Sequence, residues 1–303
     1  MDMPNNVRRA RPLLGTFVEI VASGAAIGDL DDAIDQAFVA VAQVHRLMSF
    51  HDAASDVSRL NREASARAVA VHPWTYQVLQ AAAAMHRESA CVFDITIAPL
   101  LQRRGLLPHD EDVADQDTET AGAANAIELL RDGRIRFRRP GIRIDLGGIA
   151  KGFAVDRAVD VLRAHGLEAG LVNAGGDLAA FGARREPVHL RNPNHAGRSL
   201  FQLELANAAL ASSGRMFDPF QSTGLGDCAV VDPRSRRQVD AVAGATVCAP
   251  SCMIADALTK VIMVMGKQAE RLLHRYHAAA LFVLESGDVW ITPDWQNAVR
   301  LAA

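Results

Sequence analysis

The chain has 303 residues, of which half are hydrophobic, with 32 lysine and arginine residues against 35 aspartate and glutamate residues. This length and balance predict one large or two ordinary folded domains and exclude a disordered chain. The net charge of −3, without a basic cluster, argues against nucleic acid as a partner. The sequence has no uncharged apolar run of 18 residues, which argues against a membrane span, and residues 1–11 do not resemble a secretory signal, so we expect a cytoplasmic protein.

The first half predicts strands and helices in alternation. Residues 1–12 are expected to form an arm, followed by a strand at 15–22 and a long helix that ends at Met48. Pro73 opens a second helix, because proline is tolerated in a first turn. The acidic segment 107–121 contains few apolar residues and predicts a mobile excursion.

The second half predicts short strands joined by turns, with helices at 150–164 and 251–265. Residues 134–138 and 142–145 flank a Pro-Gly turn and predict a hairpin. The remaining expected strands are 170–173, 178–181, 201–205, 209–212, 229–232, 279–284 and 289–292. This order predicts an α+β fold, with antiparallel sheets covered by helices, instead of a doubly wound parallel sheet.

One glycine-rich segment, residues 144–152, ends a predicted strand and enters a helix with Lys151 in its first turn. Free N–H groups at a helix N-terminus favour an anion, so a phosphate would fit there. The spacing matches neither of the common glycine-rich nucleotide-binding motifs. An ordinary strand-to-helix turn, with Lys151 in water, is the alternative.

Two further segments combine small or polar residues with a carboxylate. In Asn173-Ala174-Gly175-Gly176-Asp177 the glycines allow a ligand to approach the main chain, although a plain hairpin turn explains them as well. Asp256, Thr259 and Lys260 share one face of the late helix, and Asp256–Lys260 is either a surface pair or a site where the carboxylate binds a ligand or cation.

In order along the chain, these segments resemble the FAD:protein FMN transferase (ApbE) family. The matching segments are Leu14-Gly15-Thr16, Met48-Ser49-Phe50, Ser58-Arg59-Leu60-Asn61, Phe93-Asp94-Ile95-Thr96, 144–152, 173–177, Ala211-Ser212-Ser213-Gly214, Val231-Asp232-Pro233-Arg234 and 255–258. The resemblance implies a single domain over residues 1–303 with the T-fold-like architecture of that family. It also implies an activity: FAD is cleaved at its pyrophosphate, FMN passes to a Thr or Ser hydroxyl of an acceptor flavoprotein, and AMP leaves.

The same resemblance assigns roles to individual residues. It implies Mg²⁺ held by Gly148, Asp256 and Thr259, with Asp145 and Asp256 as catalytic residues. It implies that FAD contacts Leu14, Met48, Ser49, Phe50, His51, Phe93, Asp94, Ile95, Asp145, Lys151, Gly175, Gly176, Asp177, Ser213 and Asp232. We expect 144–152, 173–177 and 255–260 to converge on one cavity for the diphosphate.

The chain departs from the family pattern at several of these positions. Lys260 stands where an oxygen ligand is usual, and a charged lysine cannot ligate a cation. We expect either that Lys260 points away and leaves a weak metal site, or that it occupies part of the ion's place, and that Lys260→Thr strengthens Mg²⁺ dependence. Leu14 and His51 replace the usual Met and Tyr but still permit flavin contact. Arg103-Arg104-Gly105 replaces an expected aromatic and glycine, so the resemblance does not predict one wall of the flavin pocket.

The usual histidine before Val230-Val231-Asp232-Pro233 is missing, which leaves Asp232, Asp145 or a water molecule as the general base. Besides the transferase, two functions therefore remain open. One is a metal-dependent FAD pyrophosphatase that gives free FMN and AMP. The other is a non-catalytic FAD carrier.

Overall fold

The computed structural model describes residues 5–24, 27–108, 121–195, 197–214 and 230–302. The chain divides into two units: unit 1 takes residues 1–45, 151–227 and 240–303, and unit 2 takes residues 46–150 and 228–239. That both units belong to one flavin-transferase domain stays a prediction. Residues 109–120, most of the predicted excursion, lie outside the described residues.

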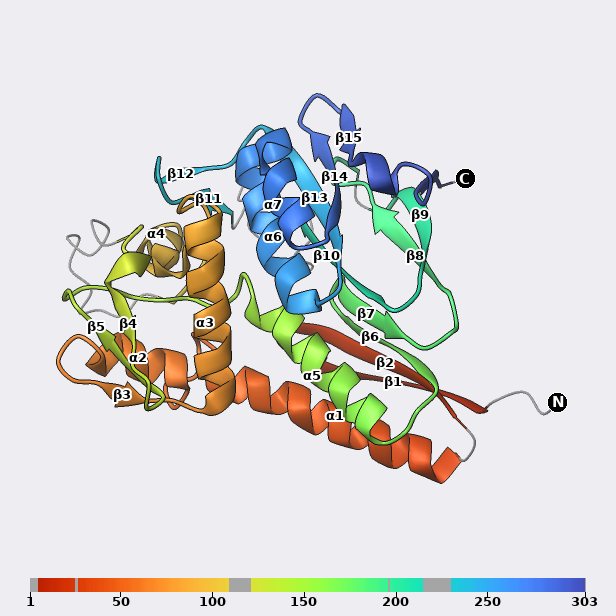
Figure 1. The fold of residues 1–303 in the computed structure, drawn as a ribbon, viewed down its shortest axis with the longest axis horizontal. Helices are drawn as coiled ribbons and strands as arrows, with labels where there is room; N and C mark the ends of the chain where they lie inside the picture. The colour runs from red at the N-terminus through yellow and green to blue at the C-terminus, as the bar shows by residue number, and fades with distance from the viewer. Residues whose placement is uncertain (1–4, 25–26, 109–120, 196, 215–229, 303) are drawn as a thin grey trace. The chain divides into compact units, whose positions relative to one another are not determined.

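Unit 1 is built on an eight-stranded antiparallel sheet in the order β1-β2-β6-β7-β10-β13-β14-β15 (Figure 1). Its strands are β1 (Asn5–Leu13), β2 (Thr16–Gly24), β6 (Ala169–Ala174), β7 (Asp177–Phe181), β10 (Ala208–Gly214), β13 (Val242–Ala249), β14 (Ala279–Leu284) and β15 (Val289–Ile291). The antiparallel α+β class predicted from the sequence is confirmed.

The helices of unit 1 are α1 (Ile27–Met48), whose last three residues belong to unit 2, α5 (Ala150–Ala164), which enters unit 1 at Lys151, α6 (Cys252–Met265) and α7 (Glu270–Arg275). Helix α6 packs on β10 and β13, and Figure 1 shows α5 beside it. Three short elements complete this part of the chain: η4 (Gly266–Ala269), η5 (Pro293–Trp295) and β16 (Arg300–Leu301).

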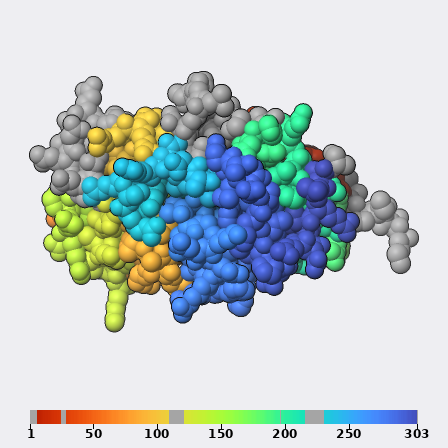
Figure 2. Space-filling model, turned by 90° about the horizontal axis from the view of Figure 1, so that it is seen from above, coloured from red at the N-terminus to blue at the C-terminus, as the bar shows by residue number. Residues whose placement is uncertain are grey.

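A smaller sheet of unit 1 joins β8 (Glu186–Arg191), β9 (Ser199–Leu205) and β16. Alternate side chains of β8 and β9 are buried, among them Leu190 and Leu203, and they pack with Trp295 near the C-terminus. Figure 2 shows the blue C-terminal residues beside the green residues of this sheet. The C-terminal segment is therefore part of the core of unit 1.

The predicted arm at residues 1–12 is wrong for its described part, because residues 5–12 lie in β1 and pair with β2 over its whole length. β1 carries few apolar residues, and its arginines form ion pairs: Arg8 with Glu19, Arg9 with Asp31 and Arg11 with Asp35. An edge strand needs only one paired side and tolerates charges and proline, so its sequence lacks the usual apolar alternation.

Unit 2 combines short helices with a three-stranded sheet, β3-β5-β4. Its elements are α2 (Asp56–Glu63), β3 (Val69–Ala70), α3 (Pro73–Glu88), η1 (Ile95–Ile97), α4 (Ala98–Arg103), η3 (Ala124–Ala126), β4 (Ile127–Leu129), β5 (Arg134–Phe137), β11 (Val231–Asp232) and β12 (Arg237–Gln238). Among the helices of the described residues, none has the length and apolar character needed to cross a lipid bilayer.

The predicted hairpin of 134–138 with 142–145 is also wrong. β5 pairs with β3 and β4, and residues 142–146 form no strand. The side chain of Asn61 replaces a strand partner: its Oδ1 accepts from the Ile144 N–H at 2.7 Å and its Nδ2 donates to the Ile144 carbonyl at 3.0 Å. Backbone groups need a partner but not necessarily a strand.

Two contacts hold α5 close to the start of α6. The carboxylate of Asp156 accepts hydrogen bonds from Ser251 Oγ and from the N–H groups of Cys252 and Met253, at 2.8 to 2.9 Å. Gly152 lies so near α6 that a Cβ on it would be 2.2 Å from the Cys252 carbonyl oxygen. The N-terminal turns of the two helices therefore lie side by side, and their polar residues face a common region.

We predict that Gly152→Ala destabilises the protein by about 1–3 kcal/mol, as overpacking usually does, because the new methyl group meets backbone that cannot rotate away. On an open helix face the same change would stabilise by about 0.5–1 kcal/mol. Urea unfolding of the variant measures the effect, with Ala164→Ser at an exposed position of α5 as the control. A Gly152→Ala protein as stable as the wild type would contradict the close approach of α5 and α6.

Candidate functional site

Four charged residues of unit 1, Lys151, Asp177, Asp256 and Lys260, form what we call the charge cluster. Lys151 lies in the first turn of α5, Asp177 begins β7, and Asp256 and Lys260 lie one turn apart on α6. Lys151 Nζ is 2.8 Å from Asp177 Oδ2, and Lys260 Nζ contacts Asp256 Oδ1. Segments far apart in the sequence thus bring together the residues predicted from them.

The two carboxylates of the charge cluster are fully buried, and the two lysines are partly exposed. Burial and the charge of Asp256 raise the pKa of Asp177, although Lys151 and Lys260 oppose the shift. Burial lowers the pKa of Lys151, but the carboxylates of Asp177 and Asp256 outweigh burial and raise it overall. Lys151 therefore stays charged at neutral pH.

Hydrogen bonds reach some of the carboxylate oxygens of the charge cluster and not others. Asp256 Oδ2 accepts from the Gly152 N–H at 3.1 Å, so the approach of α5 to α6 serves the cluster directly. Asp177 Oδ1 is buried and has no hydrogen-bond partner among the described residues. A buried carboxylate oxygen without a donor is costly and is typical of a functional site.

Thr259 and Ser213 lie next to the charge cluster. Thr259 Oγ1 donates to the main-chain carbonyl of Asp256 at 2.7 Å and lies 2.8 Å from Ser213 Oγ at the end of β10. Both hydroxyls are therefore engaged within the fold, and Thr259 is fully buried.

Beneath the cluster, Cys252 is buried and its Sγ donates to the Leu210 carbonyl at 3.9 Å. Burial raises the pKa of Cys252, and the charges of Asp177 and Asp256 raise it further. Burial also raises the pKa of Cys248 to about 11. These thiols stay protonated at neutral pH and are poor nucleophiles.

Pairing of β2 with β6 brings two predicted ligand-binding turns together. Val18 pairs with Ala174, so the turn at Leu14 and Gly15 lies beside that at Gly175 and Gly176. All four of these residues have positive φ, and a Cβ on Gly175 would be 2.6 Å from Thr16 Oγ1. Glycine is thus required at position 175 for space as well as for conformation.

His45 Nδ1 accepts a long hydrogen bond of 3.4 Å from the Leu14 N–H. Sequence reasoning missed this histidine, because its helical spacing on α1 suggests only a surface position. It also missed Asp156, whose partners at the start of α6 are far away in the chain.

In unit 2, residues 49–51 form a loop directly after Met48, the last residue of α1, and hydrogen bonds hold this loop in place. The Ser49 carbonyl accepts from Ser55 Oγ at 2.7 Å, and Ser49 Oγ accepts from the His51 N–H at 3.2 Å. Met48 is buried, Phe50 is partly exposed and His51 is exposed. The loop presents Phe50 and His51 to solvent or to a ligand.

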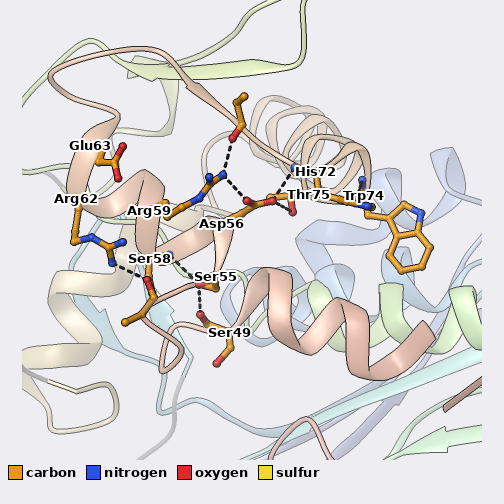
Figure 3. A network of polar contacts seen from close by, with 12 residues as sticks. Ser49, Ser55, Asp56, Ser58, Arg59, Arg62, Glu63, His72, Trp74 and Thr75 are labelled. Atoms are coloured by element: carbon orange, nitrogen blue, oxygen red, sulfur yellow. Dashed lines mark hydrogen bonds and ion pairs between the residues drawn. The ribbon is translucent and has the colours of Figure 1, made fainter. Parts of the chain in front are cut away.

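A second network surrounds Asp56, the neighbour of Ser55, whose Oγ donates to the Ser49 carbonyl of this loop (Figure 3). The buried carboxylate of Asp56 accepts from the His72 N–H at 2.8 Å, Thr75 Oγ1 at 2.7 Å and Arg59 Nη2 at 2.7 Å. Arg59 also donates to the Ala70 carbonyl at 2.6 Å. Every contact in this network is within the fold, so its role is to hold α2 against β3 and α3.

The predicted flavin-binding residues Phe93, Asp94 and Ile95 are buried in unit 2. Asp94 Oδ1 accepts from the N–H and Oγ1 of Thr96, at 2.7 and 2.5 Å. His86 Nδ1 donates to the Phe93 carbonyl at 2.9 Å and lies 3.2 Å from Asp94 Oδ2. These contacts give the side chains a structural role; contact with flavin stays a prediction.

Asp145, Gly148 and Asp232 also belong to unit 2. Asp145 Oδ2 accepts from the Gly147 N–H at 3.1 Å, and Gly148 is a partly exposed residue of the turn before α5. Burial raises the pKa of Asp232, but hydrogen bonds and charge from Arg234 outweigh it and lower the pKa. A lowered pKa makes Asp232 a weaker base. That Asp145, Gly148 and Asp232 lie beside the charge cluster stays a prediction.

The oxygens of Asp256 and Thr259 are of the type that Mg²⁺ prefers, yet they do not fit a metal site as they stand. Both carboxylate oxygens of Asp256 already have partners, Lys260 and the Gly152 N–H, and Thr259 Oγ1 has two. In the described part of the chain, three or more His, Cys, Asp or Glu residues nowhere form a group that could hold a metal ion. An ammonium group stands where a cation would have to bind.

Comparison with known proteins gives consistent matches. The model of the ApbE family matches residues 14–282. A FAD:protein FMN transferase of Vibrio cholerae is 30% identical over 237 residues, which cover 75% of this chain and 71% of that protein. Another, of Klebsiella pneumoniae, is 28% identical over 271 residues, or 86% of this chain and 84% of that protein. The crystal structure of the ApbE protein of Thermotoga maritima superposes with a TM-score of 0.86 at 25% identity, and covers 98% of this chain and 100% of that one.

The charge cluster yields a prediction about stability. Lys151→Met leaves Asp177 buried without its counter-ion and should cost about 2 kcal/mol, below the 3–5 kcal/mol typical of a fully buried pair because Lys151 is partly exposed. The double variant Lys151→Met/Asp177→Asn should recover more than half of that loss, since no unpaired carboxylate remains. Urea unfolding tests both, with Lys267→Met at an exposed position as the matched control. Equal stability of Lys151→Met and wild type would refute the pairing.

Proposed function

This chain belongs to the ApbE family, and from that membership we propose that it is a FAD:protein FMN transferase. It cleaves the pyrophosphate of FAD and transfers the FMN half to an acceptor flavoprotein. The observation that carries this function is the match of the family model over residues 14–282, together with a charge cluster built from the segments that the family pattern picks out.

The reaction is a phosphoryl transfer. An acceptor hydroxyl oxygen forms a bond to the phosphorus of the FMN half, the bond from that phosphorus to the bridging oxygen breaks, and AMP leaves with that oxygen. The hydroxyl proton passes to a base. Such reactions depend mainly on positioning and on neutralising the charge of the phosphate oxygens.

In the charge cluster, the partly exposed ammonium groups of Lys151 and Lys260 can neutralise phosphate charge. Each keeps N–H donors beyond those facing its carboxylate, since an ammonium has three. Asp177 and Asp256 hold the two lysines in place, so that their orientation is set before substrate arrives. The turns at Leu14–Gly15 and Gly175–Gly176 expose main chain for the rest of the nucleotide.

The catalytic roles of Asp145 and Asp256 are part of the same proposal. For the general base, Asp145 and Asp232 are the carboxylate candidates, and the contact with Arg234 lowers the pKa of Asp232 and so weakens it as a base. A water molecule stays the third candidate. The remaining FAD contacts proposed are those of Met48, Ser49, Phe50, His51, Phe93, Asp94, Ile95 and Ser213.

Three finer points of the function stay predictions: the Thr or Ser identity of the acceptor residue, the cytoplasmic location and a role for Mg²⁺. The first rests on the family resemblance. For Mg²⁺, the resemblance favours a site at Gly148, Asp256 and Thr259, whereas the partners already held by Asp256 and Thr259 speak against one.

The function is tested by incubating the protein with FAD, with and without a flavoprotein that carries an acceptor hydroxyl, and by measuring AMP release and covalent flavin on the acceptor. We expect AMP release that depends on the acceptor and equals the flavin attached to it. Release without acceptor would instead identify a pyrophosphatase, and FAD binding without release would identify a carrier.

A further inference from the structure

The position of Lys260 follows from the geometry of α6. Residues four apart on a helix face the same side, so a lysine at 260 reaches back to the carboxylate at 256. Its Nζ contacts Asp256 Oδ1, while the Gly152 N–H occupies Oδ2 from the opposite helix. Asp256 is fully buried, so this contact is not a loose surface pair.

Most oxygens around Lys260 already have a partner among the described residues, and the one that does not, Asp177 Oδ1, lies on a carboxylate that faces an ammonium group. Thr259, the adjacent residue on α6, donates its hydroxyl proton to the Asp256 carbonyl, and its Oγ1 lies 2.8 Å from Ser213 Oγ. Asp177 Oδ1 has no hydrogen-bond partner, but Asp177 Oδ2 faces the ammonium of Lys151. A divalent cation entering here would meet two ammonium groups and would have to displace one of them.

The charges of the cluster also balance. Two carboxylates face two ammonium groups, all in unit 1. A diphosphate brings additional negative charge, which the two lysines can meet with their remaining N–H donors. A lysine ammonium is a compact positive charge with three N–H donors, so it can neutralise the charge of phosphate oxygens as a small cation does.

We propose that the Lys260 ammonium is a built-in cation of this site: it occupies the place on Asp256 that a divalent cation would otherwise take, and with Lys151 it neutralises the diphosphate of the substrate. The diphosphate part rests on the proposed function. That Lys260 takes the place of a cation on Asp256 rests on the structure of unit 1 alone.

Binding of Mn²⁺ alone, measured by electron paramagnetic resonance of the free ion without any flavin, tests the occupation of Asp256. We expect no Mn²⁺ site at Asp256 in the wild type and one bound Mn²⁺ per chain in Lys260→Thr, which removes the ammonium and adds a hydroxyl oxygen. Lys260→Arg keeps the charge and should behave as the wild type, and Lys267→Thr is the control for loss of a lysine elsewhere.

Several outcomes would overturn the proposal. One is a Mn²⁺ site in the wild type that is lost in Asp256→Asn, because Mn²⁺ would then bind Asp256 with Lys260 still in place. Mn²⁺ binding by Lys260→Arg, or absence of binding by a folded Lys260→Thr protein, would do the same. If Lys260→Thr fails to fold, the wild-type and Lys260→Arg measurements still decide.

The second arm measures AMP release from FAD and acceptor in the presence of EDTA. The wild type should keep its rate within about twofold, and Lys260→Thr should lose about tenfold or more and recover with Mg²⁺, because the charge on the phosphate oxygens is then no longer met. A wild type that EDTA inactivates and Mg²⁺ restores would contradict the proposal. Wild-type protein that releases no AMP under any condition would refute the function instead, while Mn²⁺ binding still decides the role of Lys260.

Discussion

The burial of two carboxylates in unit 1 is the constraint on which the site depends. Ionised Asp177 and Asp256 cannot be removed from water without counter-ions, and lysines on α5 and α6 supply them. Because the partners come from different helices and from a strand end, the cluster exists only when these elements pack together. In the proposed function, the two lysines that balance these buried carboxylates also meet the charge of the phosphate.

Packing of α5 against α6 makes this arrangement possible. Gly152 removes the side chain that would separate the helices, and the Asp156 carboxylate caps the first turn of α6. Gly152 serves twice, since its N–H also donates to Asp256. A small residue and a capping carboxylate, neither of them reactive, therefore fix the distance between the two helices that carry Lys151, Asp256 and Lys260.

Much of this could be read from the sequence, where the information is local. The helices at 150–164 and 252–265 and the alternating strands were predictable from their periodicity. Helix geometry also predicts that Asp256 and Lys260 lie on the same side of α6. Three contacts were not predictable: the pairing of Lys151 with Asp177, the cap of α6 by Asp156 and the bonding of Asn61 to the main chain of Ile144. Each joins residues whose separation in the chain carries no periodic signal. The edge strand β1 was missed for the opposite reason: its arginines mask the local pattern.

The route of the chain through the two units has a consequence for synthesis. β2 pairs with β6 only after all of residues 46–150 have been made, and Val231 joins the apolar group of Leu100, Leu101 and Ala121 in unit 2 from still later in the chain. Unit 2 is therefore complete only after residue 239 has left the ribosome, and unit 1 only after β13, β14 and β15 have followed. Pairings of such long sequence separation form slowly. Nascent chains of this protein should spend most of their elongation time with unpaired strand edges. During this period a chaperone that binds exposed strands would protect them most from aggregation.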